Sequence, residues 1–357
     1  MPTHRLPAAL ASVVCSAALA LGAPAPSRAA TEAEPFEIGI RAVEGVYRPL
    51  HAAFARAARE LDAAVGAFCA TRDGTGPVRA AWDALVPAFG AIEPLRVGPF
   101  LEDNRVNRVF FWPDSRRAGE RQLRALLADG APLDAESIAG KSVAVQGLPA
   151  LERLLYGGSL EGDPVATCRV AVPVAANVRR IAEALAADWA APDGIAARAV
   201  GTPPDDPLFR SRLEVLRSLV TQLQAGLEAL AGPKLTPVVE ADARATRALP
   251  FARSGRWAAF LGGNLDGLAA LLLDAGLADA AGVADEAKFE VANARRLLAK
   301  LAGELGPDAR LREPPSAEAV GTARALRAGV LGLERLLLDR VAPALGTGTG
   351  FNSADGD

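Results

Sequence analysis

Helical periodicity along nearly the whole chain is the feature that most constrains how this sequence can fold. Between residues 36 and 70, for example, apolar side chains recur every three or four positions, as they do on a helix that buries one face. Alanine and leucine dominate these positions, aromatic residues make up only 5% of the chain, and no segment shows the alternation of a half-buried strand. The sequence therefore predicts an all-α fold whose core is formed by helix packing.

Prolines, glycines and polar residues divide this pattern into separate helices. The predicted helices cover residues 36–70, 76–92, 116–129, 163–189, 208–231, 254–275, 285–305 and 317–342. Pro49 and Pro173 fall inside two of them, where a proline removes a helical hydrogen bond and favours a kink. The stretch 191–207 is rich in proline, glycine and aspartate and is the predicted linker. We therefore expect two helical-bundle domains, residues 30–195 and 205–345, followed by a tail at 346–357.

The first 29 residues have the character of a secretory signal peptide. A weakly basic start precedes an apolar run at 8–21, and the sequence at 27–29 suits cleavage after Ala29. This run is shorter than the roughly 20 apolar residues that span a bilayer, and every later apolar stretch contains Arg, Asp or Glu. We expect a periplasmic protein with no transmembrane span after processing. A lipoprotein anchored through Cys15 remains an alternative.

The charge balance argues against a nucleic-acid partner. The formal net charge is −3 for the whole chain and becomes about −5 once a signal segment with two arginines is removed. Nucleic-acid binding needs a basic face, which an acidic chain of this composition does not favour. The expected partners are therefore a small ligand, a metal or another envelope protein.

Two cysteines remain in the processed chain, Cys69 and Cys168. An even number in an exported protein favours a disulfide, and two buried free thiols are the alternative. A bridge would close a loop of about 100 residues, which contributes about 4–5 kcal/mol in the chain-entropy model. A catalytic cysteine is not expected, because nothing marks His51, the one histidine outside the signal segment, as its partner. We expect His51 to be a packing or surface residue rather than a ligand.

Five irregular segments interrupt the helical pattern with polar and aromatic residues. They are 92–100 with Glu93 and Arg96, 110–114 with Trp112 and Asp114, 147–152 with Glu152, 249–257 with Arg253 and Ser254, and 350–357 with Asp355 and Asp357. Asp114 and Ser254 each precede a predicted helix, so helix capping is their simpler interpretation. Large aromatic residues such as Trp112 and Trp257 are first of all expected to anchor a core, although they could also line a pocket.

The segment 147–157 places one carboxylate in the first turns of an apolar helix. Gly147 and Pro149 mark the helix start, where proline loses no hydrogen bond. Glu152 follows Pro149 by three residues and shares its helix face, so a histidine at position 149 would have made a metal-binding pair. Two interpretations remain for Glu152: a buried structural ion pair with Arg96 or Arg253, or a part in a ligand site.

In their order and spacing, these segments resemble the imelysin family of exported bacterial helical proteins. The resemblance covers most of the processed chain and rests on Glu93-Pro-Leu-Arg-Val-Gly-Pro99, Phe111-Trp-Pro-Asp114, Gly147 to Glu152, Arg253-Ser254 and the closing Gly-Phe-Asn-x-x-Asp-Gly-Asp. It is strongest to the branch of predicted periplasmic lipoproteins and iron-regulated proteins. It implies two helical-bundle domains, a site in the cleft between them, and a link to iron uptake or iron-regulated expression.

This chain departs from the family pattern at one position that matters chemically. Members described as metallopeptidases carry G-x-H-x-x-E, where this sequence reads Gly147-x-Pro149-x-x-Glu152. A zinc peptidase needs three protein ligands and an activated water, so zinc is not expected here. The remaining metal hypothesis is an oxygen-only site for a hard cation, iron or calcium, formed by Glu152, Asp355 and Asp357 with help from Glu93 and Asp114.

The leading hypothesis is an exported, non-enzymatic binding or accessory protein linked to the uptake of iron or another metal. The residues expected to line its ligand cleft are Glu93, Arg96, Trp112, Asp114, Gly147, Pro149, Glu152, Arg253 and Ser254. The two alternatives are a metallopeptidase-like enzyme with altered ligands and an envelope scaffold that binds a protein or peptide.

Overall fold

The structure is a computed structural model that describes Met1 and residues 33–201, 210–306 and 314–347. All regular elements within these residues are helices, and they contain no strand, which confirms the predicted all-α fold. The predicted signal segment lies almost wholly outside the described residues. So do Asp355 and Asp357 of the C-terminal tail.

Seven longer helices carry most of the packing, and shorter ones connect them. The longer helices are α2 (Arg48–Thr71), α3 (Gly76–Ile92), α9 (Pro164–Ala190), α11 (Arg212–Ala229), α14 (Trp257–Ala269), α16 (Ala284–Leu305) and α17 (Ala317–Leu336). The shorter ones include α1 (Ala33–Arg41), α4 (Arg105–Val109), α5 (Ala118–Asp129), α6 (Ala135–Ala139), α7 (Leu148–Tyr156), α8 (Ser159–Gly162), α10 (Ile195–Gly201), α12 (Thr236–Val239), α13 (Ala243–Thr246), α15 (Leu277–Ala280) and α18 (Ala342–Ala344). Four π-helical segments are also present in the described residues: η1 (Ala42–Tyr47), η5 (Leu230–Lys234), η6 (Ala270–Asp274) and η7 (Leu337–Val341).

Most predicted helix boundaries agree with the structure to within a few residues, and two details differ. Pro49 lies in the first turn of α2, directly after η1, so the helical path continues there instead of breaking. Part of the predicted linker forms α10, because Ile195 and Ala196 are buried against the core. Apolar positions in a short segment can thus override a composition typical of a linker.

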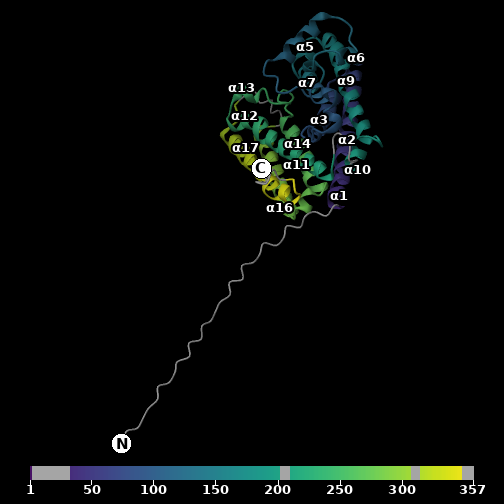
Figure 1. Ribbon diagram of the computed structural model, residues 1–357. Coiled ribbons are helices and arrows are strands. Elements are labelled where there is room, and N and C mark those ends of the chain that lie inside the picture. Colours follow the sequence, from purple (N-terminus) through teal and green to yellow (C-terminus); the bar gives the residue numbers. More distant parts are fainter. Residues whose placement is uncertain (2–32, 202–209, 307–313, 348–357) are drawn as a thin grey trace, which may run out of the picture.

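The contact between α3 and α14 joins the N-terminal and C-terminal parts of the sequence. It is made through glycines: a Cβ at Gly267 would lie 1.9 Å from the carbonyl oxygen of Ala91, and one at Gly263 would lie 2.3 Å from that of Pro87. Without side chains at these positions the two helix backbones can touch. In Figure 1 these two helices lie near the middle of the molecule, with α5, α6 and α7 towards one end and α16 towards the other.

Elsewhere α2 packs against both α3 and α9, and α16 packs against α17. Buried apolar side chains from both sides of the predicted linker form one continuous core. The division into bundles at 30–195 and 205–345 therefore stays a prediction. The disulfide predicted from the cysteine count is present and ties α2 to α9 through Cys69 and Cys168. No helix in the described ranges combines the length and apolar character needed to cross a bilayer.

An aromatic cluster positions two of the irregular segments against the α3–α14 contact. The ring of Phe251 lies 5.0 Å from that of Phe260 and 5.7 Å from that of Phe110, and Phe89 lies 5.1 Å from Phe110. All four side chains are at most 2% exposed. The cluster therefore fixes the loops at 110–114 and 249–257 on a rigid core, which is where the candidate site lies.

Candidate functional site

The start of α7 forms as the sequence predicts. Gly147 is the residue before the helix and Pro149 lies in its first turn. A Cβ at Gly147 would lie 2.1 Å from the carbonyl oxygen of Val109, so glycine allows α7 to begin against the end of α4. This close approach places the start of α7 beside the segment that leads into Phe110 of the aromatic cluster.

Glu152 is joined to the turn at 249–257 by two hydrogen bonds. Its Oε1 atom accepts from the backbone N–H of Ser254 and from the Ser254 hydroxyl, both at 2.8 Å. Each of the two side chains is 8% exposed. Ser254 is therefore not the helix cap expected from the sequence: α14 begins only at Trp257, after a turn in which Gly255 has φ of +75°.

Burial raises the pKa of the Glu152 carboxyl above its ordinary value. The hydrogen bonds from Ser254 and the positive charges of Arg253 and Arg153 act in the opposite direction but do not cancel the effect of burial. Glu152 holds its proton at higher pH than an exposed glutamate does. Within the described residues Glu152 forms no ion pair: Arg96 is paired with Glu93, and Arg253 lies beyond ion-pair distance. The interpretation of Glu152 as a member of a buried ion pair is thus not supported.

The carboxylate of Asp114 does cap a helix, although Arg117 and not Asp114 occupies the N-cap position of α5. Its two carboxylate oxygens accept hydrogen bonds from the backbone N–H groups of Ala118 and Gly119, at 2.7 and 2.9 Å, where α5 begins. Arg153, one position after Glu152 on α7, lies 3.5 Å from the same carboxylate. Trp112 Nε1 donates to the carbonyl oxygen of Ala248 at 2.9 Å and so reaches the loop that leads to Ser254.

Seven of the nine residues expected in the ligand cleft lie on the segments that these contacts join, and a cleft lined by them stays a prediction. They are Trp112, Asp114, Gly147, Pro149, Glu152, Arg253 and Ser254, which we call the Glu152 site. Arg253 is exposed and forms no hydrogen bond or ion pair with the described part of the chain. Its positive charge acts to lower the pKa of both Glu152 and Arg153. A guanidinium group that can bind a ligand therefore lies close to this site.

Glu93 and Arg96 belong to a second cluster, of which the sequence analysis identified only these two residues. Glu93 accepts from Lys234 Nζ and pairs with Arg96, while Lys234 also donates to Asn264 Oδ1 at 2.7 Å. Asn264 in turn donates to the carbonyl oxygen of Gly90 at 2.8 Å. Glu93, Lys234 and Asn264 are each at most 2% exposed, so this cluster is a buried ionic contact between α3, η5 and α14.

Burial opposes ionisation of Glu93, but the charges of Lys234 and Arg96 outweigh it and hold the pKa of this carboxyl below its ordinary value. Burial also lowers the pKa of Lys234, although its contact with Glu93 counteracts this. No hydrogen bond or ion pair among the described residues joins this cluster to the Glu152 site.

Sequence reasoning missed Lys234 and Asn264. Each is a single polar residue in an apolar surrounding, Lys234 after Gly-Pro and Asn264 within the glycine-rich start of α14. Buried polar side chains normally have a hydrogen-bond partner, so a single polar residue on an apolar helix face indicates a buried polar contact. Their partner could not be named from sequence, since Lys234 lies 141 residues from Glu93.

The described residues hold no group of three or more His, Cys, Asp and Glu side chains arranged to bind a metal ion. Glu93 is occupied by Lys234, and both oxygens of Asp114 accept backbone hydrogen bonds. Since Asp355 and Asp357 lie outside the described residues, the oxygen-only cation site stays a prediction that depends on the tail.

Comparison with known proteins gives a family for this chain. The family model described as Imelysin matches residues 47–330. A solved imelysin-like protein from Psychrobacter arcticum 273-4 is similar with 18% identity and a TM-score of 0.70, covering 90% of this chain and 98% of that one. A "putative iron-regulated protein A precursor" from Parabacteroides distasonis ATCC 8503 has 14% identity and a TM-score of 0.70, covering 87% of this chain and 96% of that one.

At these identities the two solved structures show a shared fold and no more. No curated protein matches the chain. The family match, however, extends over most of the sequence and contains both the Glu152 site and the buried Glu93–Lys234 cluster. This chain therefore belongs to the imelysin family.

Proposed function

We propose that this protein is an exported, non-enzymatic binding protein that serves the uptake of iron or another metal nutrient. The observation that carries the proposal is the state of Glu152, whose Oε1 is held by two hydrogen bonds from Ser254 while position 149 is proline. One solved structure with this fold carries a name that links it to iron regulation, and this agrees with the proposed role.

A carboxylate in this state suits binding better than hydrolysis. A metallopeptidase needs imidazole or carboxylate ligands around one metal and a base free to activate water. Pro149 supplies no ligand atom, and Glu152 Oε1 already accepts from two donors. The residue that catalytic members of the family would use is thus engaged in joining α7 to the turn at 249–257.

The charges around the site favour a ligand that carries carboxylates. Arg253 offers an exposed guanidinium, and Arg153 lies beside Glu152 on α7. Arginine binds carboxylates through two parallel hydrogen bonds, which is stronger and more specific than a point charge. Burial raises the pKa of Glu152, which reduces the tendency of its carboxyl to carry negative charge beside such a ligand. A chelate of ferric iron with a carboxylate ligand meets both conditions, since it offers carboxylates to the arginines and contains iron.

The test is calorimetric titration of the chelator-stripped chain with ferric citrate, haem and Ca²⁺, each added alone. We expect ferric citrate to bind, and Arg253→Gln to weaken it about 10- to 100-fold because a charge-assisted hydrogen bond is lost. Arg56→Gln is the matched control, since Arg56 is also exposed and lies on α2, outside the site.

Two results would contradict this function. If none of the three compounds gave a heat of binding, the proposal that this protein binds a metal-linked ligand would be contradicted. Stoichiometric zinc in the purified protein that is lost in Glu152→Ala, together with cleavage of a peptide library, would favour the peptidase alternative instead.

Export to the periplasm is part of the same proposal and rests on the predicted signal segment at 1–29. Mass spectrometry of the protein purified from an envelope fraction tests it. A mature chain that begins at residue 30 supports export by signal cleavage, whereas a lipid-modified Cys15 at the new N-terminus would show the membrane-anchored alternative.

A further inference from the structure

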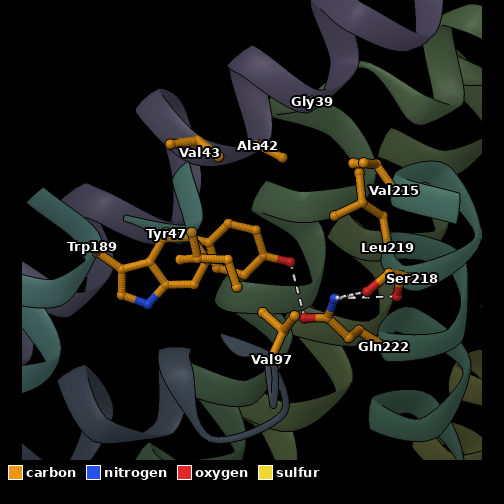
Figure 2. Close-up of a pocket in the computed structure, with 11 residues that line it drawn as sticks. Gly39, Ala42, Val43, Tyr47, Val97, Trp189, Val215, Ser218, Leu219 and Gln222 are labelled. Carbon is orange, nitrogen blue, oxygen red and sulfur yellow. Dashed lines mark hydrogen bonds between the residues drawn. The ribbon is translucent and has the colours of Figure 1, made fainter. Parts of the chain in front are cut away.

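A separate apolar pocket lies where η1, the end of α9, α10 and α11 meet. Its volume is about 310 Å³ including the open mouth, and its walls include Val43, Tyr47, Val97, Trp189, Val215 and Gln222. Figure 2 shows Tyr47 crossing the pocket between Trp189 on one side and Gln222 on the other. None of the residues that line it belongs to the Glu152 site.

The aromatic wall of this pocket consists of two stacked, buried rings, one of which extends from a π-helical turn. Tyr47 and Trp189 are stacked, with ring centroids 4.4 Å apart and ring planes 3° apart, and both side chains are 2% exposed. Tyr47 is the last residue of the π-helical segment η1, which also supplies Ala42 and Val43 to the lining. Single π-helical turns inside α-helices are rare and occur frequently at functional sites.

Tyr47 and Gln222 satisfy each other in this pocket, whereas Nε1 of Trp189 is buried without a hydrogen-bond partner. The Tyr47 hydroxyl donates to Gln222 Oε1 at 2.9 Å, and Gln222 Nε2 donates to the backbone oxygen of Ser218 at 3.1 Å (Figure 2). No charged side chain is present among the lining residues. A charged ligand would lose its hydration here without compensation, whereas an apolar one gains about 25 cal/mol for each Å² that it buries.

The size of the pocket limits the ligand further. The whole volume is at the lower end of the range for small-molecule sites. With the side chains as they stand, the enclosed part has room for about one water molecule, so only a group as small as a hydroxyl or methyl fits there. The body of the ligand must lie in the mouth. The Tyr47 oxygen retains lone pairs and can accept one hydrogen bond from a ligand hydroxyl.

We propose that this pocket binds a small, uncharged, largely apolar molecule that carries one hydroxyl, of the size of a phenol. The site is distinct from the proposed iron-chelate site and does not depend on it. Its ligand is selected by apolar contact with Val43, Val97 and Val215 and by one hydrogen bond to Tyr47.

Saturation-transfer NMR with phenol, toluene and benzoate, each added to the full chain at millimolar concentration, tests this site. We expect transfer to phenol, weaker transfer to toluene and none to benzoate. Val215→Phe should abolish the phenol signal by filling the pocket. Val291→Phe is the matched control, because Val291 is also a valine that is 4% exposed and it lines a different apolar pocket.

A second variant keeps the proposal testable if Val215→Phe does not fold. Ser218→Leu fills the same mouth from a partly exposed position and keeps the backbone oxygen to which Gln222 donates. The site is refuted if phenol gives no transfer, if benzoate gives as much as phenol, or if the phenol signal survives in both filled variants. Loss of the signal in Val291→Phe as well would also overturn it, because the effect would not be local.

Discussion

His51 should make the stability of this protein depend steeply on pH. The side chain is fully buried in α2, with Nδ1 2.8 Å from the carbonyl oxygen of Tyr47 and Nε2 without a hydrogen-bond partner. Its neighbours include the rings of Trp189 at 5.5 Å and Phe100 at 6.4 Å. Burial among these groups lowers the pKa of His51 from 6.5 to about 4, because the imidazolium would be desolvated.

The sign and size of the effect follow from proton binding. Below pH 6.5 the unfolded chain takes up a proton at His51 that the folded protein does not accept until about pH 4. Stability therefore falls as the pH drops through this window and is fully retained above it. A shift of this size corresponds to about 3 kcal/mol in total, of which about 2.5 kcal/mol is lost between pH 7 and pH 4.5.

Urea unfolding followed by circular dichroism at half-unit pH steps measures this loss. Other groups also titrate in the window, so the relevant quantity is the difference between the wild-type chain and His51→Leu, which fills the same apolar surroundings without a titrating group. We expect the wild type to lose about 2.5 kcal/mol more than the variant between pH 7 and pH 4.5. Parallel pH profiles for the two proteins would refute the assignment of a buried, neutral His51.

Three further predictions concern the buried contacts. Glu152→Ala should lower the free energy of unfolding in urea by about 2–4 kcal/mol, because two buried donors lose their acceptor. Glu152→Gln keeps an acceptor oxygen and should lower it by under about 1 kcal/mol. Equal losses in the two variants would contradict this. Gly267→Ala should lower the free energy of unfolding by about 3 kcal/mol, because its Cβ would meet backbone at 1.9 Å. Gly262→Ala on the same helix has its nearest contact at 3.9 Å and should stabilise by up to about 1 kcal/mol. Lys234→Met should lower the free energy of unfolding by about 3–5 kcal/mol, because it leaves the Glu93 carboxylate without its main partner. Adding Glu93→Gln should recover part of this stability, as measured by thermal denaturation. A double variant less stable than Lys234→Met would argue against this.

Helix positions were largely predictable because they depend on local sequence. The apolar spacing, together with Pro77 and Pro164 near helix starts, gave α3 and α9 nearly to the residue. The π-helical segments were not predicted, since the extra residue shifts the apolar spacing by only one position, and the expected spacing of three or four residues already varies by one. The helix α10 was missed because its burial depends on the core that packs against Ile195, and not on the composition of the segment.

The candidate site divides in the same way. The sequence by itself determined that α7 starts at Gly147 and Pro149, that Asp114 caps a helix, and that position 149 offers no imidazole. Only the tertiary structure decided that Ser254 binds Glu152 instead of capping α14, and that Lys234 neutralises Glu93. These partners lie 102 and 141 residues apart in the chain. Which buried charge or acceptor meets which donor depends on how whole helices pack, because hydrogen bonds act over about 3 Å and no local pattern encodes that distance.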